Sequence, residues 1–97
     1  MSTFIILMKL TDQGAKAIKE APARIEAGIK GWESMGGKML GFYVTMGEYD
    51  YIAIGEAPSD EVAAAFVLSL GTHGNEHTTT LKAFPQDQFA KIVKMLP

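Results

Sequence analysis

The residues best suited to chemistry lie together in one short stretch, Glu48-Tyr49-Asp50-Tyr51, directly after Gly47. A carboxylate beside a phenol in a turn can bind a polar ligand or transfer a proton. The same residues also suit a turn, in which Gly47 supplies an unusual φ, Asp50 bonds backbone amides and Tyr49 packs. Tyr49 and Asp50 are therefore candidate ligand-binding residues, and the turn-forming interpretation is the stronger one.

Arg24 is the only arginine of the chain. It follows a predicted helix break, where its guanidinium can hold a carboxylate or a phosphate. It can equally pair with Glu20 or Glu26, or lie along the helix surface. Arg24 stays a ligand-binding candidate with these alternatives open.

Tyr43 is a further candidate, because together with Trp32, Met35 and Met39 it can line a pocket between a helix and a sheet. A set of methionines and aromatic residues at such spacings is more often ordinary core. Both interpretations of Tyr43 remain open.

His73 and His77 are four residues apart, a spacing that can place two imidazoles on one helical face as metal ligands. Gly74-Asn75 lies between them and interrupts such a helix, and no cysteine or carboxylate stands at a fixed offset. We therefore expect no metal site, and a loop position or a capping hydrogen bond for each histidine. His77 remains a candidate because an imidazole can act as an acid or a base near neutral pH.

Composition restricts the possible functions further. The chain has 97 residues, no cysteine and a net charge of −2, and its nine Lys and Arg residues are spread from Lys9 to Lys94. This distribution argues against nucleic acid as a partner, and the apolar run at 4–8 is too short for a signal sequence or a membrane span. The absence of phosphate-loop and nucleophile-elbow motifs agrees with a chain that needs no cofactor. We expect one cytoplasmic domain covering residues 1–97.

The hydrophobic pattern predicts four strands, at residues 4–8, 38–46, 51–55 and 78–84. Helical spacing predicts a short helix to about residue 20, capped by Thr11 or Asp12, and a longer one from near Pro22 to Gly36-Gly37. Two more helices are expected, one from Ser59 to Gly71 and one over residues 86–96. The short connection at Gly47 makes the second and third strands an antiparallel hairpin.

This order of elements, βαββαβ followed by a helix, is that of a ferredoxin-like α+β sandwich with a four-stranded antiparallel sheet. Two helices can cover only one face of the sheet. We expect the other face to be apolar, receiving Met39, Tyr43, Tyr51, Thr78 and Thr80. An apolar face of this kind predicts a homo-oligomer, most simply a two-fold dimer packed sheet to sheet.

Several segments carry a resemblance to a known family. They are Thr11-Asp12-Gln13-Gly14, Ala21-Pro22-Ala23-Arg24, Gly36-Gly37-Lys38, Tyr43 to Asp50, and Gly74-Asn75 with Thr78 to Phe84. Together they resemble the GYD domain family of small bacterial proteins, named for a turn that here is Gly47-Glu48-Tyr49-Asp50. The resemblance covers nearly the whole chain and implies a ferredoxin-like fold similar to dimeric α+β barrels, without an established activity. Many members carry arginine where this chain has His77, so no anion-binding role is carried over to that position.

Three functional hypotheses follow. The favoured one is a non-catalytic oligomeric module that binds a small molecule or a partner protein near the Gly47 turn and the sheet face. The second is a cofactor-independent monooxygenase, isomerase or lyase, in which Asp50 or a histidine moves protons and Tyr49 orients the substrate; it rests on analogy of fold. The third is a purely structural assembly subunit.

Overall fold

The computed structural model describes residues 1–97 and contains one four-stranded antiparallel sheet. Its strands are β1 (Ser2–Leu10), β2 (Lys38–Val44), β3 (Tyr51–Ala57) and β4 (Glu76–Ala83). They lie in the order β2-β3-β1-β4. The predicted ferredoxin-like α+β fold is confirmed, and the apolar strand β1 is central, as its composition indicated.

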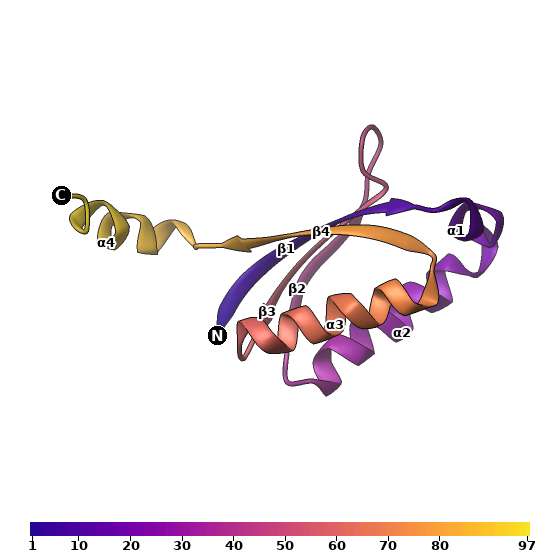
Figure 1. Cartoon of the computed structure of the whole chain (residues 1–97), viewed down its shortest axis with the longest axis horizontal. Coiled ribbons are helices and arrows are strands. Elements are labelled where there is room, and N and C mark those ends of the chain that lie inside the picture. Colours follow the sequence, from indigo (N-terminus) through magenta and orange to yellow (C-terminus); the bar gives the residue numbers. More distant parts are fainter.

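Helices α2 (Ala21–Ser34) and α3 (Asp60–His73) lie side by side on one face of this sheet (Figure 1). A short helix α1 (Asp12–Lys16) and a 3₁₀ turn η1 (Ile18–Glu20) connect β1 to α2. Pro22 lies in the first turn of α2, where a missing N–H costs nothing, so the predicted break before it is confirmed. The hydroxyl of Thr11 caps α1 by accepting a hydrogen bond from the Gly14 amide at 3.1 Å.

Helix α3 is longer than the sequence suggested. The hydroxyl of Ser59 accepts a hydrogen bond from the Val62 amide at 3.2 Å, so the start of the helix agrees with the prediction. The helix continues through Gly71 and ends at His73, because Gly74 takes the left-handed conformation with φ of 74°. The prediction that Gly71 ends this helix was wrong, and His73 belongs to the helix, not to a loop.

The core lies between the sheet and the two long helices. Trp32 is its most deeply buried large side chain, and its ring meets that of Phe66 edge to face with centroids 5.1 Å apart. The indole lies directly over the backbone of Gly55. The other buried apolar residues of this cluster are Phe4, Ile6, Met8, Tyr51, Ala53, Ala57 and Ala63.

A bulge in β2 corrects the predicted assignment of its side chains to the two faces. Met39 pairs with Gly55 and Gly41 with Ile54, so Leu40 is an extra residue between them. Met39 therefore packs against the core on the helix-covered face instead of the open one. Tyr51 was also wrongly assigned: it pairs with the buried Met8 and is itself 5% exposed. One inserted residue exchanges the two faces of a strand.

The face of the sheet without helices is apolar, as predicted, but most of its residues differ from those expected. Thr78 and Thr80 stand opposite Met8 and Ile6, so they belong to the helix side. The register instead places a second set of apolar side chains on the uncovered side, of which Tyr43 alone was predicted. We call this set the open face: Ile5, Leu7, Tyr43, Ile52, Ile54 and Leu81.

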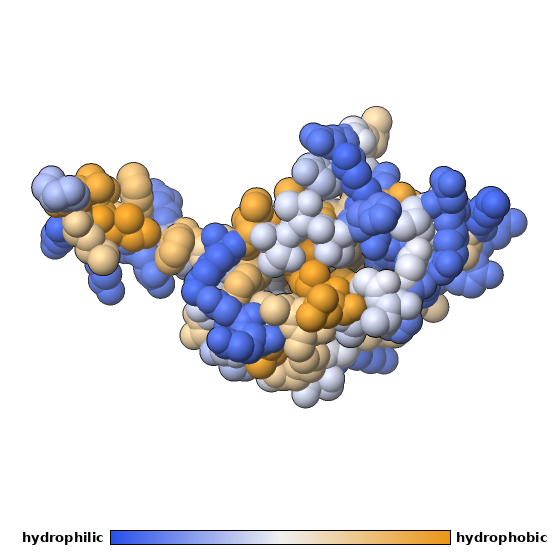
Figure 2. Space-filling model, viewed as in Figure 1, coloured by the Kyte–Doolittle hydropathy of each residue, from blue (hydrophilic) through white to orange (hydrophobic).

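The C-terminal residues 84–97 form an arm that projects away from the sheet (Figure 1). Within this C-terminal arm, the predicted single helix is a 3₁₀ turn η2 (Gln86–Gln88) followed by α4 (Phe89–Lys94), and the principal contacts of α4 are with η2. Figure 2 shows apolar side chains gathered on the arm. Its predicted apolar stripe is exposed to solvent: Phe89, Ile92, Val93 and Leu96.

Candidate functional site

The carboxylate of Asp50 joins the β2–β3 hairpin to the central strand. Its Oδ2 accepts a hydrogen bond from the Leu10 amide at 2.8 Å, while its own amide donates to the Met8 carbonyl at 2.8 Å. The carbonyl of Asp50 accepts from the Thr45 amide at 2.8 Å and closes the turn. Gly47 has φ of 107°, which side chains resist. Both expected features of the turn, the glycine conformation and the backbone bonding of Asp50, are present.

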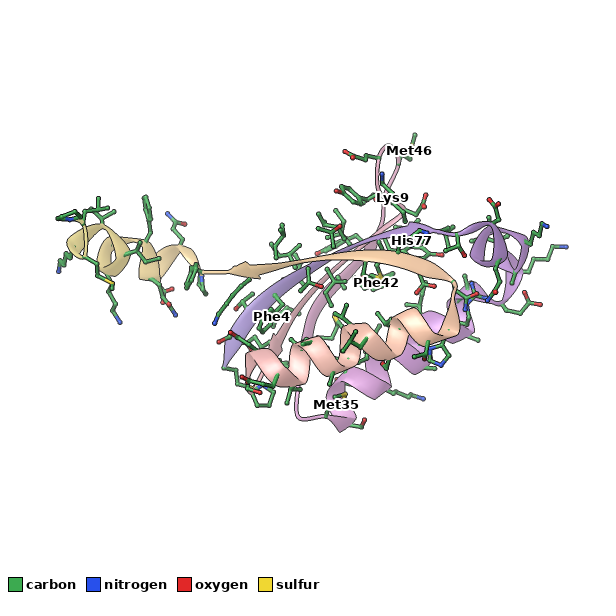
Figure 3. The ribbon with its side chains drawn as sticks, viewed as in Figure 1. Phe4, Lys9, Met35, Phe42, Met46 and His77 are labelled. Carbon is green, nitrogen blue, oxygen red and sulfur yellow. The ribbon has the colours of Figure 1, made fainter.

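The outer part of the hairpin carries charge and one prominent apolar side chain. The Lys9 ammonium lies 3.7 Å from Glu48 Oε1 and 5.4 Å from the centroid of the Tyr49 ring. His77 stands opposite Lys9 in the β1–β4 register and is exposed, in a strand where a loop was expected. Met46 is 99% exposed at the projecting tip of the hairpin (Figure 3).

A cavity of about 300 Å³ lies between the sheet and helices α2 and α3. This volume is at the lower end of the range typical of small-molecule sites. Twelve of its 19 lining residues are hydrophobic, among them Ile25, Met39 and Phe42. Tyr51, one of these twelve, adds its hydroxyl. The other lining residues are two glycines and five polar residues: Arg24, Ser69, His73, Asn75 and Glu76.

The hydroxyl of Tyr51 is buried in the cavity wall without a hydrogen-bond partner. Burial raises the pKa of this phenol above its usual value, and the nearby Arg24 charge partly opposes the increase. A buried polar group usually has a partner, because leaving it without one costs about 1–3 kcal/mol. The cavity wall therefore presents a hydrogen-bonding group that the fold does not use.

Arg24 and Glu76 bring opposite charges to the same cavity. The Arg24 Nη1 donates to the Ala17 carbonyl at 2.8 Å and forms no ion pair, so neither Glu20 nor Glu26 is its partner. Burial raises the pKa of Glu76, while the charges of Arg24 and His73 lower it. Arg24, His73 and Glu76 all line this cavity, and none of them forms an ion pair with another.

The five candidates from the sequence are distributed over three places. Tyr43 lies on the open face, Tyr49 and Asp50 in the hairpin, and Arg24 beside the cavity on the opposite face of the sheet. His77 is on the open side, so the structure does not bring these residues together.

Tyr51 and Glu76 were missed as cavity residues. The alternation along β3 would have placed Tyr51 on the buried side once Ala53 was assigned to the core. Nothing in the sequence marks the position of Glu76.

No group of three or more His, Cys, Asp or Glu side chains could hold a metal ion, and no helix is long and apolar enough to span a membrane.

Comparison with known proteins identifies the family. A family model described as the GYD domain matches residues 4–93. A protein of Thermus thermophilus, named glutamine synthetase and cystathionine beta-lyase binding protein, is 35% identical over 86 residues, which cover 88% of this chain and 90% of that protein. No solved structure gives a significant match. The chain thus belongs to the GYD domain family.

Proposed function

We propose that this chain is a non-catalytic binding protein whose partners are other proteins, with enzymes of amino-acid metabolism as the first candidates. The observation that carries the proposal is the similarity to the Thermus thermophilus protein over nearly the full length of both chains. That relative is named for binding two enzymes, glutamine synthetase and cystathionine beta-lyase. The uncovered apolar surface described above supports the proposal, because surfaces of this kind mark interaction sites.

The open face and the C-terminal arm suit association with a second copy of the chain. Every copy carries both an apolar sheet face and an amphipathic helix that leaves its own sheet. Phe89, Ile92 and Val93 follow helical spacing, while Lys91 and Lys94 stay on the polar side. In the proposed two-fold dimer, the arm of each chain covers the open face of the other.

The hairpin tip remains free when the arms cover the open faces, and it is our candidate contact for the partner enzyme. Met46 is almost fully exposed and projects from the body (Figure 3). Methionine adapts to differently shaped surfaces, which suits a protein that binds more than one partner. Glu48, beside it, adds a charge that can orient the encounter.

Self-association is tested by sedimentation of the wild type and of Val93→Asp at micromolar concentration. We expect a dimer for the wild type and a folded monomer for the variant, because a charge in the apolar stripe opposes burial. Lys91→Asp, a charged change on the polar side of α4, is the control and should leave the dimer intact. A monomeric wild type, or a dimer unaffected by Val93→Asp, would contradict the arm-on-face arrangement.

Partner binding is tested by titrating this protein onto immobilised glutamine synthetase and cystathionine beta-lyase. We expect saturable binding to at least one enzyme and a loss of about tenfold in affinity for Met46→Ser, the size of effect typical of an interface anchor. Met35→Ser removes a methionine far from the hairpin and should bind as the wild type does. If neither enzyme is bound, the proposed partner class is wrong; if Met46→Ser binds normally, the hairpin is not the contact.

A further inference from the structure

The cavity between the sheet and helices α2 and α3 has no part in the protein-binding function proposed above. It combines an apolar wall with a concentration of polar groups near Tyr51. The Tyr51 side chain is 5% exposed, yet its hydroxyl has no hydrogen-bond partner. Such a hydroxyl can donate to an oxygen atom of a bound molecule, and this bond would replace the one that the protein lacks.

The charges around the cavity restrict the chemistry of that molecule. A guanidinium has five N–H donors, and the only hydrogen bond that the Arg24 side chain forms is with the Ala17 carbonyl, so donors remain for an anionic group. Glu76 is half-buried at the same cavity, without a hydrogen-bonded or ion-paired side chain. A molecule with both a carboxylate and an ammonium group matches this pair of charges.

The rest of the wall is suited to an apolar body. Ile25, Met39, Phe42 and Leu70 line it together with side chains of the central strand (Figure 3 labels Phe42). Burial of aliphatic or aromatic carbon against these residues is favourable in proportion to the area removed from water. A polar or charged ligand body would lose hydration here without gaining partners.

We propose that this cavity binds a free α-amino acid with an apolar side chain. Arg24 and the Tyr51 hydroxyl hold the carboxylate, Glu76 holds the ammonium group, and the side chain fills the apolar part of the cavity. A simple carboxylic acid would leave Glu76 facing an anion, and a simple amine would leave Arg24 facing a cation. An amino acid, which carries both charged groups, should therefore bind this site more tightly than a simple acid or a simple amine does.

The test is isothermal titration of the full-length protein with L-leucine and L-phenylalanine. We expect saturable binding of at least one of the two amino acids. Isocaproate, which lacks the ammonium group of leucine, and isoamylamine, which lacks its carboxylate, should each bind at least about tenfold more weakly. Tyr51→Phe removes a hydrogen bond to the carboxylate, and Glu76→Gln removes the negative charge that faces the ammonium group. Each should weaken amino-acid binding by roughly tenfold to a hundredfold.

Tyr43→Phe is the matched control, since it removes the same hydroxyl from an exposed tyrosine on the opposite face. It should bind the amino acid as the wild type does, and thermal melts establish that both phenylalanine variants are folded. Three outcomes would overturn the proposal: no saturable binding of either amino acid, isocaproate binding as tightly as leucine, or unchanged binding by folded Tyr51→Phe. None of these outcomes depends on whether a partner enzyme is bound.

Discussion

The layer between the helices and the sheet is built differently at its two ends. At one end Trp32 fills the space against Phe66 and the backbone of Gly55, with 1% of its surface exposed. At the other end the same helices and sheet leave a cavity of about 300 Å³ beside Tyr51, with charged residues around it. Protein interiors are ordinarily filled to the density of the first end. The first end therefore stabilises the fold by close packing, whereas the second is the end at which we propose that a ligand binds.

The largest effect is expected from Trp32→Ala, which would empty the filled end. Removing a buried tryptophan of this kind costs about 3–5 kcal/mol in the free energy of unfolding, from lost burial and from the space left behind. Denaturant unfolding, followed by far-ultraviolet circular dichroism, measures the change. A loss below about 1 kcal/mol would remove the contrast between the two ends, because the region around Trp32 would then be no better packed than the cavity.

Gly55→Ala tests the packing of the filled end by adding one carbon atom, where Trp32→Ala removes a side chain. A Cβ at this position would lie 2.9 Å from the Trp32 Nε1, so the indole or the strand must shift. We expect a loss of about 1–3 kcal/mol, typical of an overpacked core. Gly71→Ala is the matched control, because a Cβ there meets nothing within 4 Å and alanine favours the helix. A Gly55→Ala protein as stable as the wild type would show that this end has unfilled space as well.

Tyr51→Phe addresses the hollow end and should have a smaller effect of opposite sign. Because the lost hydroxyl is buried without a partner, we expect the free energy of unfolding to rise by about 0.5–1 kcal/mol in the absence of ligand. Chemical denaturation of the wild type and the variant in the same buffer gives the difference. A loss of about 1 kcal/mol would instead show that the hydroxyl is hydrogen bonded in solution, and that the fold uses it.

The fold could be predicted from the sequence better than the site could. Two neighbouring residues illustrate this difference: the role of Asp50 was predicted correctly, whereas the side of the sheet to which Tyr51 points was not. Hydrophobic alternation and helix caps are local, so the strands, the break at Pro22 and the backbone role of Asp50 could be derived from residue types. Which residues line a cavity depends instead on which face of each strand packs against the helices. The bulge at Leu40 reversed the expected orientation of Met39, and Tyr51 turned inward although it belongs to a polar stretch.

Site residues distant in the sequence were the least predictable. Arg24 precedes Glu76 by about half the chain, and only the packing of α2 near the start of β4 brings their charges to one cavity. No spacing rule connects two such positions, because each contact depends on the tertiary arrangement of several elements. The sequence thus identified Arg24 as a candidate without revealing its neighbours.

The smallest expected effect concerns the pH dependence contributed by Glu76. Burial raises the pKa of its carboxyl above the ordinary value of 4.5, so the native state binds a proton more tightly than the unfolded chain does. The stability linked to that proton is fully present below the ordinary pKa and is lost as the pH rises through the raised value. Glu76→Gln, which cannot titrate, lacks this dependence.

Urea unfolding of both proteins between about pH 4 and 7 should therefore show the wild type losing stability relative to the variant as the pH rises. The difference in free energy of unfolding between the two proteins could instead stay constant with pH or change in the opposite direction. Glu76 would then be solvated or ion paired in solution, and the cavity would hold no desolvated carboxyl.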